Sequence, residues 1–145
     1  MADVMTLENF ADGALELFNV SASVGKNGVN SRSDVFLVQA LLREILDRQR
    51  GGISYRDCPI PTGTFNKATS QLIRKYQRCH KRERIARDCL INRAVGLYVP
   101  GTLRPWTIIQ LNFDLQERHM LEGFPGGFME LVMDKYPELS LMLLA

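Results

Sequence analysis

The sequence predicts an all-α protein, in which a three-helix core carries an additional helix at its N-terminal end and another at its C-terminal end. Apolar residues recur every three to four positions in several segments, which is the spacing of one face of a helix. Prolines and glycines separate these segments. The composition, with 46% hydrophobic and 23% charged residues, is typical of a chain that can bury a core.

The first helix is expected over residues 6–18, where Thr6 suits the N-cap position. Its apolar side would be formed by Leu7, Phe10, Ala11, Ala14, Leu15 and Phe18. Residues 20–30 are expected to form a loop, because Gly25 and Gly28 interrupt any regular pattern there.

A second helix is predicted to begin near Ser31 and to end at 50–52. Ser31 and Asp34 have the spacing of a capping box, in which the first side chain caps a free amide and the acid reaches back. The apolar arc is wide enough to contact more than one neighbour and contains Val35, Leu37, Val38, Leu41, Leu42, Ile45 and Leu46. Phe36 lies outside this arc and is expected to be exposed.

The third helix is predicted from about Asn66 to Lys81, after a loop over residues 53–64. Its inner face would contain Phe65, Ala68, Thr69, Leu72, Ile73, Tyr76 and Cys79. Its opposite side would carry Arg74, Lys75, Arg78, Lys81 and Arg82. The clean separation of the two sets favours a helix with one solvent-facing basic side.

Two further helices are expected in the C-terminal third. Pro105 suits the first turn of a short helix that ends near Asn112. After a break at Gly126 and Gly127, a helix near 128–136 precedes an apolar end that is too short to span a membrane. Its apolar face should be covered, either by the chain's own N-terminal helix or by a partner or second copy bound through this segment.

Charge is distributed unevenly along the chain, although the net charge is only +2. Residues 1–24 carry four acidic and no basic residues, whereas residues 74–93 carry eight basic and two acidic ones. The basic segment therefore forms either a binding surface for an anionic partner or a surface that packs near the acidic ends.

No segment is apolar enough to cross a membrane, and Met1–Leu17 has acids where a signal peptide needs positive charge. We therefore expect a protein of the bacterial cytoplasm, or one that reaches the periplasm without a signal peptide. In that setting reduced thiols are the expected state of the three cysteines.

Three short motifs suggest a family. Val35–Leu42 fits the form V-x-x-L-Q-x-x-L, Thr62–Gln77 resembles D-G-x-F-G-x-x-T-x-x-A-V-x-x-F-Q, and Thr107–Leu111 fits T-x-x-x-L. Residues 23–112 thus resemble the three-helix peptidoglycan-binding domain of bacterial and phage cell-wall proteins. The lead-in Ser23–Asn30 is similar to relatives associated with type VI secretion. The implied organisation is an N-terminal helical extension over 1–22, this domain over 23–112 and a C-terminal helical extension over 113–145.

The resemblance implies a non-catalytic module that recognises peptidoglycan and helps to target a wall-active or secreted partner. Its ligand-binding residues would be Gln39, Thr62, Gly63, Thr64, Asn66, Thr69 and Gln77, with a basic surface at Arg74, Arg78 and Lys81. The alternative is a protein–protein adaptor of a secretion or phage system with the same fold. The chain departs from the family at Thr62, which replaces Asp, at Asn66, which replaces a Gly, and at Cys89, which replaces the Gly of a second turn.

Other functional interpretations have weaker support in the sequence. Gln39, Thr69 and Gln77 could simply anchor loops, and Phe36, Tyr55 and Trp106 could form an aromatic platform for a sugar or belong to the core. No nucleic-acid motif accompanies the basic segment, so nucleic acid is not the expected partner. Cys58, Cys79, His80 and Cys89 lack the spacing of a zinc site. No catalytic residue, metal or cofactor is expected.

Overall fold

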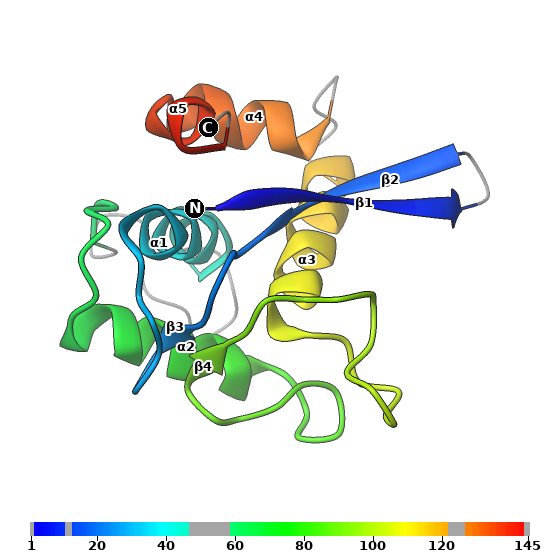
Figure 1. Ribbon diagram of the computed structural model, residues 1–145, viewed down its shortest axis with the longest axis horizontal. Coiled ribbons are helices and arrows are strands. Elements are labelled where there is room, and N and C mark those ends of the chain that lie inside the picture. Colours follow the sequence, from blue (N-terminus) through cyan, green and yellow to red (C-terminus); the bar gives the residue numbers. More distant parts are fainter. Residues whose placement is uncertain (1, 11–12, 47–58, 122–126, 144–145) are drawn as a thin grey trace.

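Helices dominate the structure, a computed structural model that describes residues 2–10, 13–46, 59–121 and 127–143 (Figure 1). Five α-helices and two short antiparallel strand pairs make up the regular structure of these residues. One hydrophobic cluster joins residues from the first, middle and last parts of the chain, including Leu17, Leu41 and Leu139. The three predicted segments therefore share one core.

The N-terminal segment is a β-hairpin, so the predicted helix over 6–18 is wrong. Strand β1 (Asp3–Phe10) pairs with β2 (Gly13–Asn19), with Val4 opposite Phe18. A short apolar run can satisfy both helical and strand periodicity, and here pairing with its neighbour and contact with a helix decide the outcome. In the sequence, an Asp-Gly pair at positions 12–13 between two apolar runs favours a hairpin over a helix.

Helix α1 (Arg32–Leu46) is the centre of the fold and begins where the sequence predicts. It contacts α2, α3 and α5, as its wide apolar arc suggested. Phe36 is only 7% exposed, so the expectation that it would be exposed is wrong. The capping box also differs, because the buried Asp34 carboxylate accepts hydrogen bonds from Ser21 N, Ser21 Oγ and Ala22 N in addition to Ser31 Oγ. It thereby fastens the preceding loop to α1.

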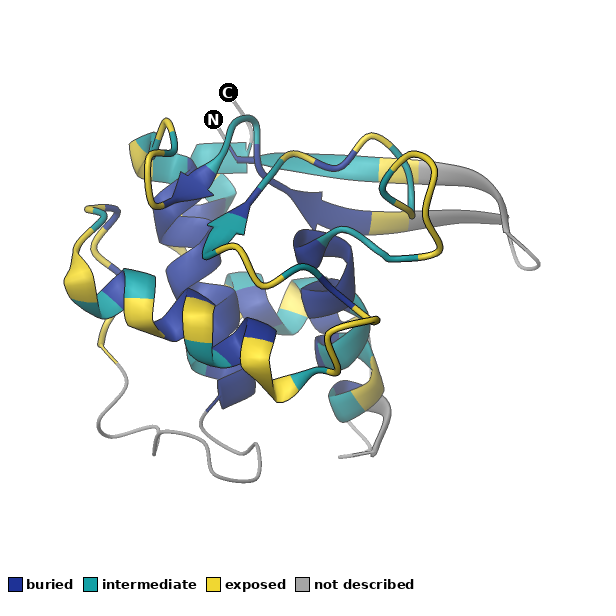
Figure 2. Cartoon of the chain, turned by 90° about the horizontal axis from the view of Figure 1, so that it is seen from below, coloured by how far each residue is buried: buried dark blue, intermediate teal, exposed yellow. Residues whose placement is uncertain are grey.

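Helix α2 (Lys67–Cys79) has the predicted amphipathic form, and Figure 2 shows buried and exposed residues alternating along it. Helix α3 (Thr107–Leu121) is longer than the predicted segment 105–112, and the expected boundary after residue 112 falls inside it. Strands β3 (Val24–Gly25) and β4 (Leu90–Ile91) join the loop before α1 to the loop after α2.

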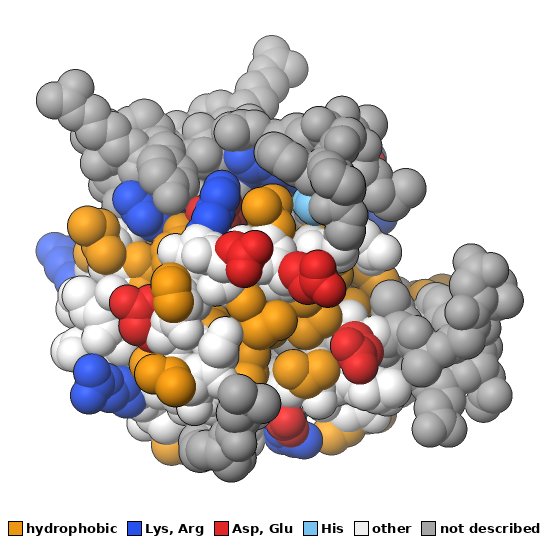
Figure 3. Space-filling model, turned by 90° about the horizontal axis from the view of Figure 1, so that it is seen from above, with side chains coloured by type: hydrophobic (Ala, Val, Ile, Leu, Met, Phe, Trp, Pro, Cys, Tyr) orange, Lys and Arg blue, Asp and Glu red, His pale blue; other side chains and the backbone are white. Residues whose placement is uncertain are grey.

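The C-terminal helices α4 (Phe128–Lys135) and α5 (Glu138–Leu143) pack on the same core. Phe128, Val132, Tyr136 and Leu139 are buried, and the Phe128 ring meets Phe18 of β2 edge to face with ring centroids 6.1 Å apart. The chain thus covers this face itself, but with β2, α1 and α3 in place of the expected N-terminal helix. Figure 3 views the molecule from this side and shows apolar side chains among acidic ones.

Buried carboxamides connect elements that are distant in sequence. The Asn112 side chain accepts from Phe18 N at 2.8 Å and donates to Phe18 O at 2.9 Å, which copies the pattern of a strand pair between α3 and β2. Asn19 makes the same two bonds to the backbone of Ala94, at 3.0 and 2.9 Å. Such bonds matter because a buried backbone group without a partner destabilises the fold. Among the described residues, no helix has the length and apolar character needed to cross a membrane.

Candidate functional site

Six of the seven sequence-predicted ligand residues meet at the turn before α2. The Gln39 side-chain oxygen accepts from Thr62 N and Gly63 N at 2.8 and 2.9 Å. Its Nε2 donates to Thr69 Oγ1 at 2.9 Å and to Thr64 O at 3.2 Å. The hydrogen-bonding capacity of this buried carboxamide is therefore occupied within the chain.

The residues of this turn have distinct positions. Gly63 has φ +81°, a left-handed geometry that favours glycine, and a Cβ there would lie 2.7 Å from Arg32 Cγ. Asn66 is extended, with φ −146°, and its side chain caps α2 by accepting from Thr69 N at 2.9 Å. Asn66 therefore does not use the left-handed geometry that a Gly at this position would allow. Thr62, Thr64 and Asn66 are exposed, so these are the residues of the turn that a ligand could reach most easily.

The seventh residue, Gln77, lies toward the other end of α2 and anchors a second turn. Its oxygen accepts from Cys89 N at 2.8 Å, and its Nε2 donates to Leu90 O and to Thr107 Oγ1 at 3.1 and 3.2 Å. Cys89 has φ +57°, so this residue adopts the left-handed geometry that a glycine more often adopts in a turn. Gln39 and Gln77 therefore each anchor a turn through hydrogen bonds to its backbone, one near each end of α2.

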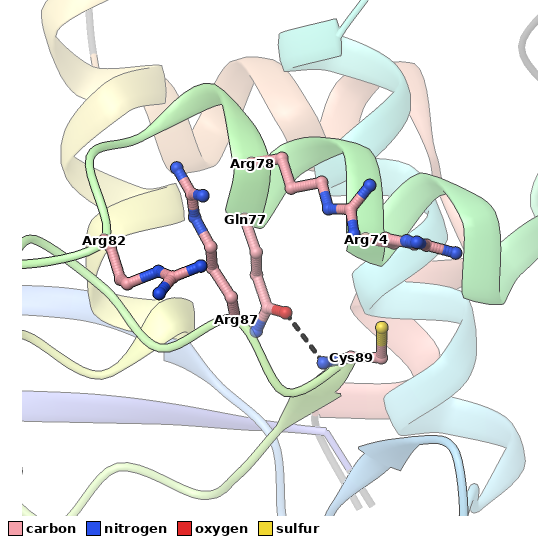
Figure 4. Close-up of a pocket in the computed structure, with 6 residues that line it drawn as sticks. All are labelled: Arg74, Gln77, Arg78, Arg82, Arg87 and Cys89. Carbon is pink, nitrogen blue, oxygen red and sulfur yellow. Dashed lines mark hydrogen bonds between the residues drawn. The ribbon is translucent and has the colours of Figure 1, made fainter.

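Gln77 and Cys89 also line a cavity of about 370 Å³, which we call the arginine-lined pocket. Its lining residues are Arg74, Gln77, Arg78, Arg82, Arg87 and Cys89. In Figure 4 Arg74 and Arg78 lie on one side of Gln77, and Arg82 and Arg87 lie on the other. Four guanidinium groups and no carboxylate line this pocket, so its electrostatic potential is strongly positive.

Among the residues that the structure describes, three of these arginines have no partner. Arg87 donates to His80 O at 2.7 Å, which holds its side chain across the loop after α2. Arg74, Arg78 and Arg82 make no hydrogen bond or ion pair with the described residues. By contrast, Arg93 of the same basic segment pairs with the acidic N-terminal strand through Asp3, at 3.2 Å. Part of the basic segment therefore packs near the acidic N-terminal strand, as one of the two alternatives predicted. Arg74, Arg78 and Arg82 leave positive charge at the pocket, whereas Arg84, which also makes no side-chain hydrogen bond or ion pair within the described part of the chain, lies outside it.

The arrangement is suited to binding anions. A guanidinium group presents a rigid set of donors that matches a carboxylate or phosphate with two parallel hydrogen bonds. Lys81, the third predicted basic residue, is exposed but does not line the pocket. Arg87 and Cys89 were not predicted as site residues, because only the folding back of the loop after α2 brings them to Arg74 and Arg78.

A polar cluster that the sequence did not reveal joins α2 to α3. The Asp114 carboxylate accepts hydrogen bonds from Tyr76 Oη, His80 Nε2 at 2.9 Å and Gln110 Nε2 at 2.8 Å. Burial raises the pKa of Asp114, but the hydrogen bonds from His80, Tyr76 and Gln110 outweigh it and leave this pKa below its usual value. Burial, together with the Asp114 charge, raises the pKa of Tyr76 well above its ordinary value. The tyrosine therefore stays protonated as a hydrogen-bond donor, and the cluster links α2 to α3.

We expect Asp114→Asn to lower the free energy of unfolding at neutral pH by about 1–3 kcal/mol, because it removes charge-assisted hydrogen bonds. The lowered pKa of Asp114 stabilises the fold fully above the ordinary carboxyl pKa of about 3.9, and this contribution is lost as pH falls toward the folded-state pKa. Urea unfolding between pH 7 and pH 3 should therefore show a steeper acid loss in the wild type than in the variant. Equal acid slopes would contradict this role.

The other sequence-predicted candidates are distributed as follows. Trp106 is partly buried against the core, as the structural interpretation of this residue expected. Cys79 is exposed, and no group of three His, Cys, Asp or Glu residues in the described part of the chain could hold a metal ion. Tyr55 and Cys58 lie outside the described residues.

The chain was compared with protein-family models, curated proteins and solved structures, and none of them matches it.

Proposed function

We propose that this protein is a non-catalytic binding module for bacterial cell-wall peptidoglycan, with the arginine-lined pocket as its binding site. The observation that carries the proposal is a group of three arginines around one cavity that make no hydrogen bond or ion pair within the described part of the chain. The stem peptides of peptidoglycan carry free carboxylates, and guanidinium groups bind carboxylates with two hydrogen bonds each. The sequence motifs of the turns at both ends of α2 point to the same ligand.

The site differs from the one that the motif residues suggest. Gln39, Asn66 and Thr69 bond to one another, so the proposal assigns them to the support of the helix entry. Gln77 plays the same supporting part for the pocket, because it holds Cys89 in place. The ligand contacts fall to the arginines, whose charge remains uncompensated in the described part of the chain.

The lining residues also explain why we propose binding without catalysis. Hydrolysis of a glycan needs a pair of carboxyl groups that act as acid and base or nucleophile. The arginine-lined pocket is formed by arginines, one glutamine and one cysteine. This composition supplies positive charge and hydrogen-bond donors, which hold an anion but do not transfer a proton at neutral pH.

A protein adaptor with an acidic partner is the second candidate, and the same unpaired arginines favour it. The two candidates differ in whether isolated cell wall should bind the protein. Purified peptidoglycan binds the first kind of module directly, whereas an adaptor requires a protein that wall preparations lack.

Co-sedimentation with insoluble purified peptidoglycan tests the proposal. The wild type should pellet at low salt and be released as salt rises, because added ions screen the attraction. Arg74→Gln and Arg78→Gln should each weaken binding by roughly ten-fold, since a hydrogen bond to a charged group contributes about 1.5 kcal/mol or more. Both side chains are exposed, so the melting temperature should change little.

Lys67→Gln is the matched control, because it removes one positive charge from an exposed position of α2 outside the pocket. It should pellet nearly as the wild type does. Failure of the wild type to pellet at low salt would refute wall binding. If the wild type instead captured an acidic protein from the native cell and the same arginine variants abolished that capture, the adaptor function would be supported in place of wall binding.

A further inference from the structure

A second cavity, of about 160 Å³, lies next to the arginine-lined pocket, and we call it the tryptophan-lined pocket. The lining residues that matter here are Ala86, Asp88, Leu90, Asn92, Arg104 and Trp106. Its volume is below the roughly 300–1,000 Å³ of whole small-molecule sites, so it suits one ring or one side group of a larger ligand.

The two pockets share a wall. Along residues 86–90, Arg87 and Cys89 line the arginine-lined pocket, whereas Ala86, Asp88 and Leu90 line the tryptophan-lined pocket. Residues of one short segment, which turns at Cys89, therefore line the two cavities in alternation. A ligand that crosses this segment can occupy both pockets at once.

The tryptophan-lined pocket holds polar groups that the fold leaves unused. Asn92 and Arg104 make no side-chain hydrogen bond within the described part of the chain, and the buried Trp106 Nε1 has no partner there. Asp88 uses only Oδ1, which accepts from Gln77 Nε2 and Leu90 N. A buried donor without an acceptor is rare in folded proteins and calls for a bound group or water.

The loop over residues 98–105, which forms part of this pocket, is held together by its own hydrogen bonds. A β-bridge joins Tyr98 to Pro105, and Val99 N donates to Arg104 O at 2.9 Å. Thr102 Oγ1 donates to Val99 O at 2.8 Å and accepts from Arg104 N at 3.1 Å. A preformed cavity binds a small group without first having to order its walls.

We infer that the tryptophan-lined pocket is a subsite for a neutral sugar ring that bears an amide group, beside the site for carboxylates. Its single acid, Asp88, and single base, Arg104, offset each other, whereas the neighbouring pocket carries four cations. Apolar side chains next to hydroxyl- and amide-binding groups fit the mixed character of a sugar. This subsite rests on the proposed function, since a wall fragment joins an amino sugar to an acidic peptide.

Trp106 is the only tryptophan in the chain, so its indole N–H gives a single NMR signal that reports on this pocket. Titration of the ¹⁵N-labelled protein with N-acetylglucosamine should shift this signal, with a Kd on the order of millimolar for so few contacts. Asn92→Ala should weaken the response by roughly five-fold, as loss of one neutral hydrogen bond does. Gln71→Ala, which truncates an exposed amide side chain on α2, should leave it unchanged.

The free sugar carries no carboxylate, so its binding does not depend on the neighbouring arginines. No shift of the indole signal at saturating sugar, or equal affinities for Asn92→Ala and the wild type, would overturn the subsite. A shift in a protein that fails to pellet with peptidoglycan would refute the proposed wall function while leaving the sugar site established.

Discussion

Gly25→Ala is expected to lower the free energy of unfolding by about 3 kcal/mol or more, the range of backbone strain combined with steric overlap. Gly25 has φ +138°, and a Cβ there would lie 2.2 Å from Cys89 O and 2.9 Å from Leu90 Cα. Because both are backbone atoms, relief requires that β3 and β4 move apart. Cys89 bounds the arginine-lined pocket, so ligand binding should fall as well. Urea unfolding measures the first effect, and co-sedimentation measures the second.

Gly96→Ala separates the effect of backbone strain from that of steric overlap. Gly96 has a similar φ of +145°, but a Cβ there meets nothing within 4 Å. Its replacement should destabilise the protein by about 1 kcal/mol, which is the conformational part alone. Equal losses for the two variants would show that the close approach of Gly25 to Cys89 has no energetic weight.

Gln39→Ala is expected to lower the free energy of unfolding by about 2–4 kcal/mol, because it leaves several buried polar groups without partners. The affected groups include Thr62 N, Gly63 N and Thr69 Oγ1. Gln39→Met, which keeps the volume but not the hydrogen bonds, should still be strongly destabilised. Chemical denaturation of the three proteins provides the measurement.

Thr64→Ala is the control for this turn, since Thr64 is exposed and its hydroxyl makes no hydrogen bond within the described part of the chain. It should change stability by less than about 0.5 kcal/mol. A Gln39→Ala protein that kept wild-type stability but lost peptidoglycan binding would make Gln39 a ligand contact, contrary to its role as an anchor.

Sequence patterns predicted α1, α2 and α4 because each has a long or cleanly divided helical pattern that tertiary contacts reinforce. The hairpin was missed because the apolar residues of a short segment fit two periodicities, and its pairing depends on contact with α3. Phe36 was misplaced because α1 is covered on more sides than one apolar arc implies.

The candidate site was predicted only in part, for a physical reason. Arg74 and Arg78 share one helix face, so their proximity follows from helical spacing alone. Arg82, Arg87 and Cys89 reach the pocket through a turn whose geometry depends on the Gln77 side chain. The hydrogen-bonded cluster of Tyr76, His80 and Asp114 likewise forms only when α2 packs on α3. No local sequence pattern predicts that packing.

The central claim is that the arginine-lined pocket is the binding site. An NMR titration with a soluble muropeptide that bears a free stem-peptide carboxylate tests it most directly. We expect the side-chain Nε–H signals of Arg74, Arg78, Arg82 and Arg87 to shift together, because a bound carboxylate changes the environment of each guanidinium group. The signal of Arg93, which pairs with Asp3, should stay in place. Shifts confined to the turn over residues 62–66, or the absence of any arginine shift at saturating muropeptide, would contradict this site.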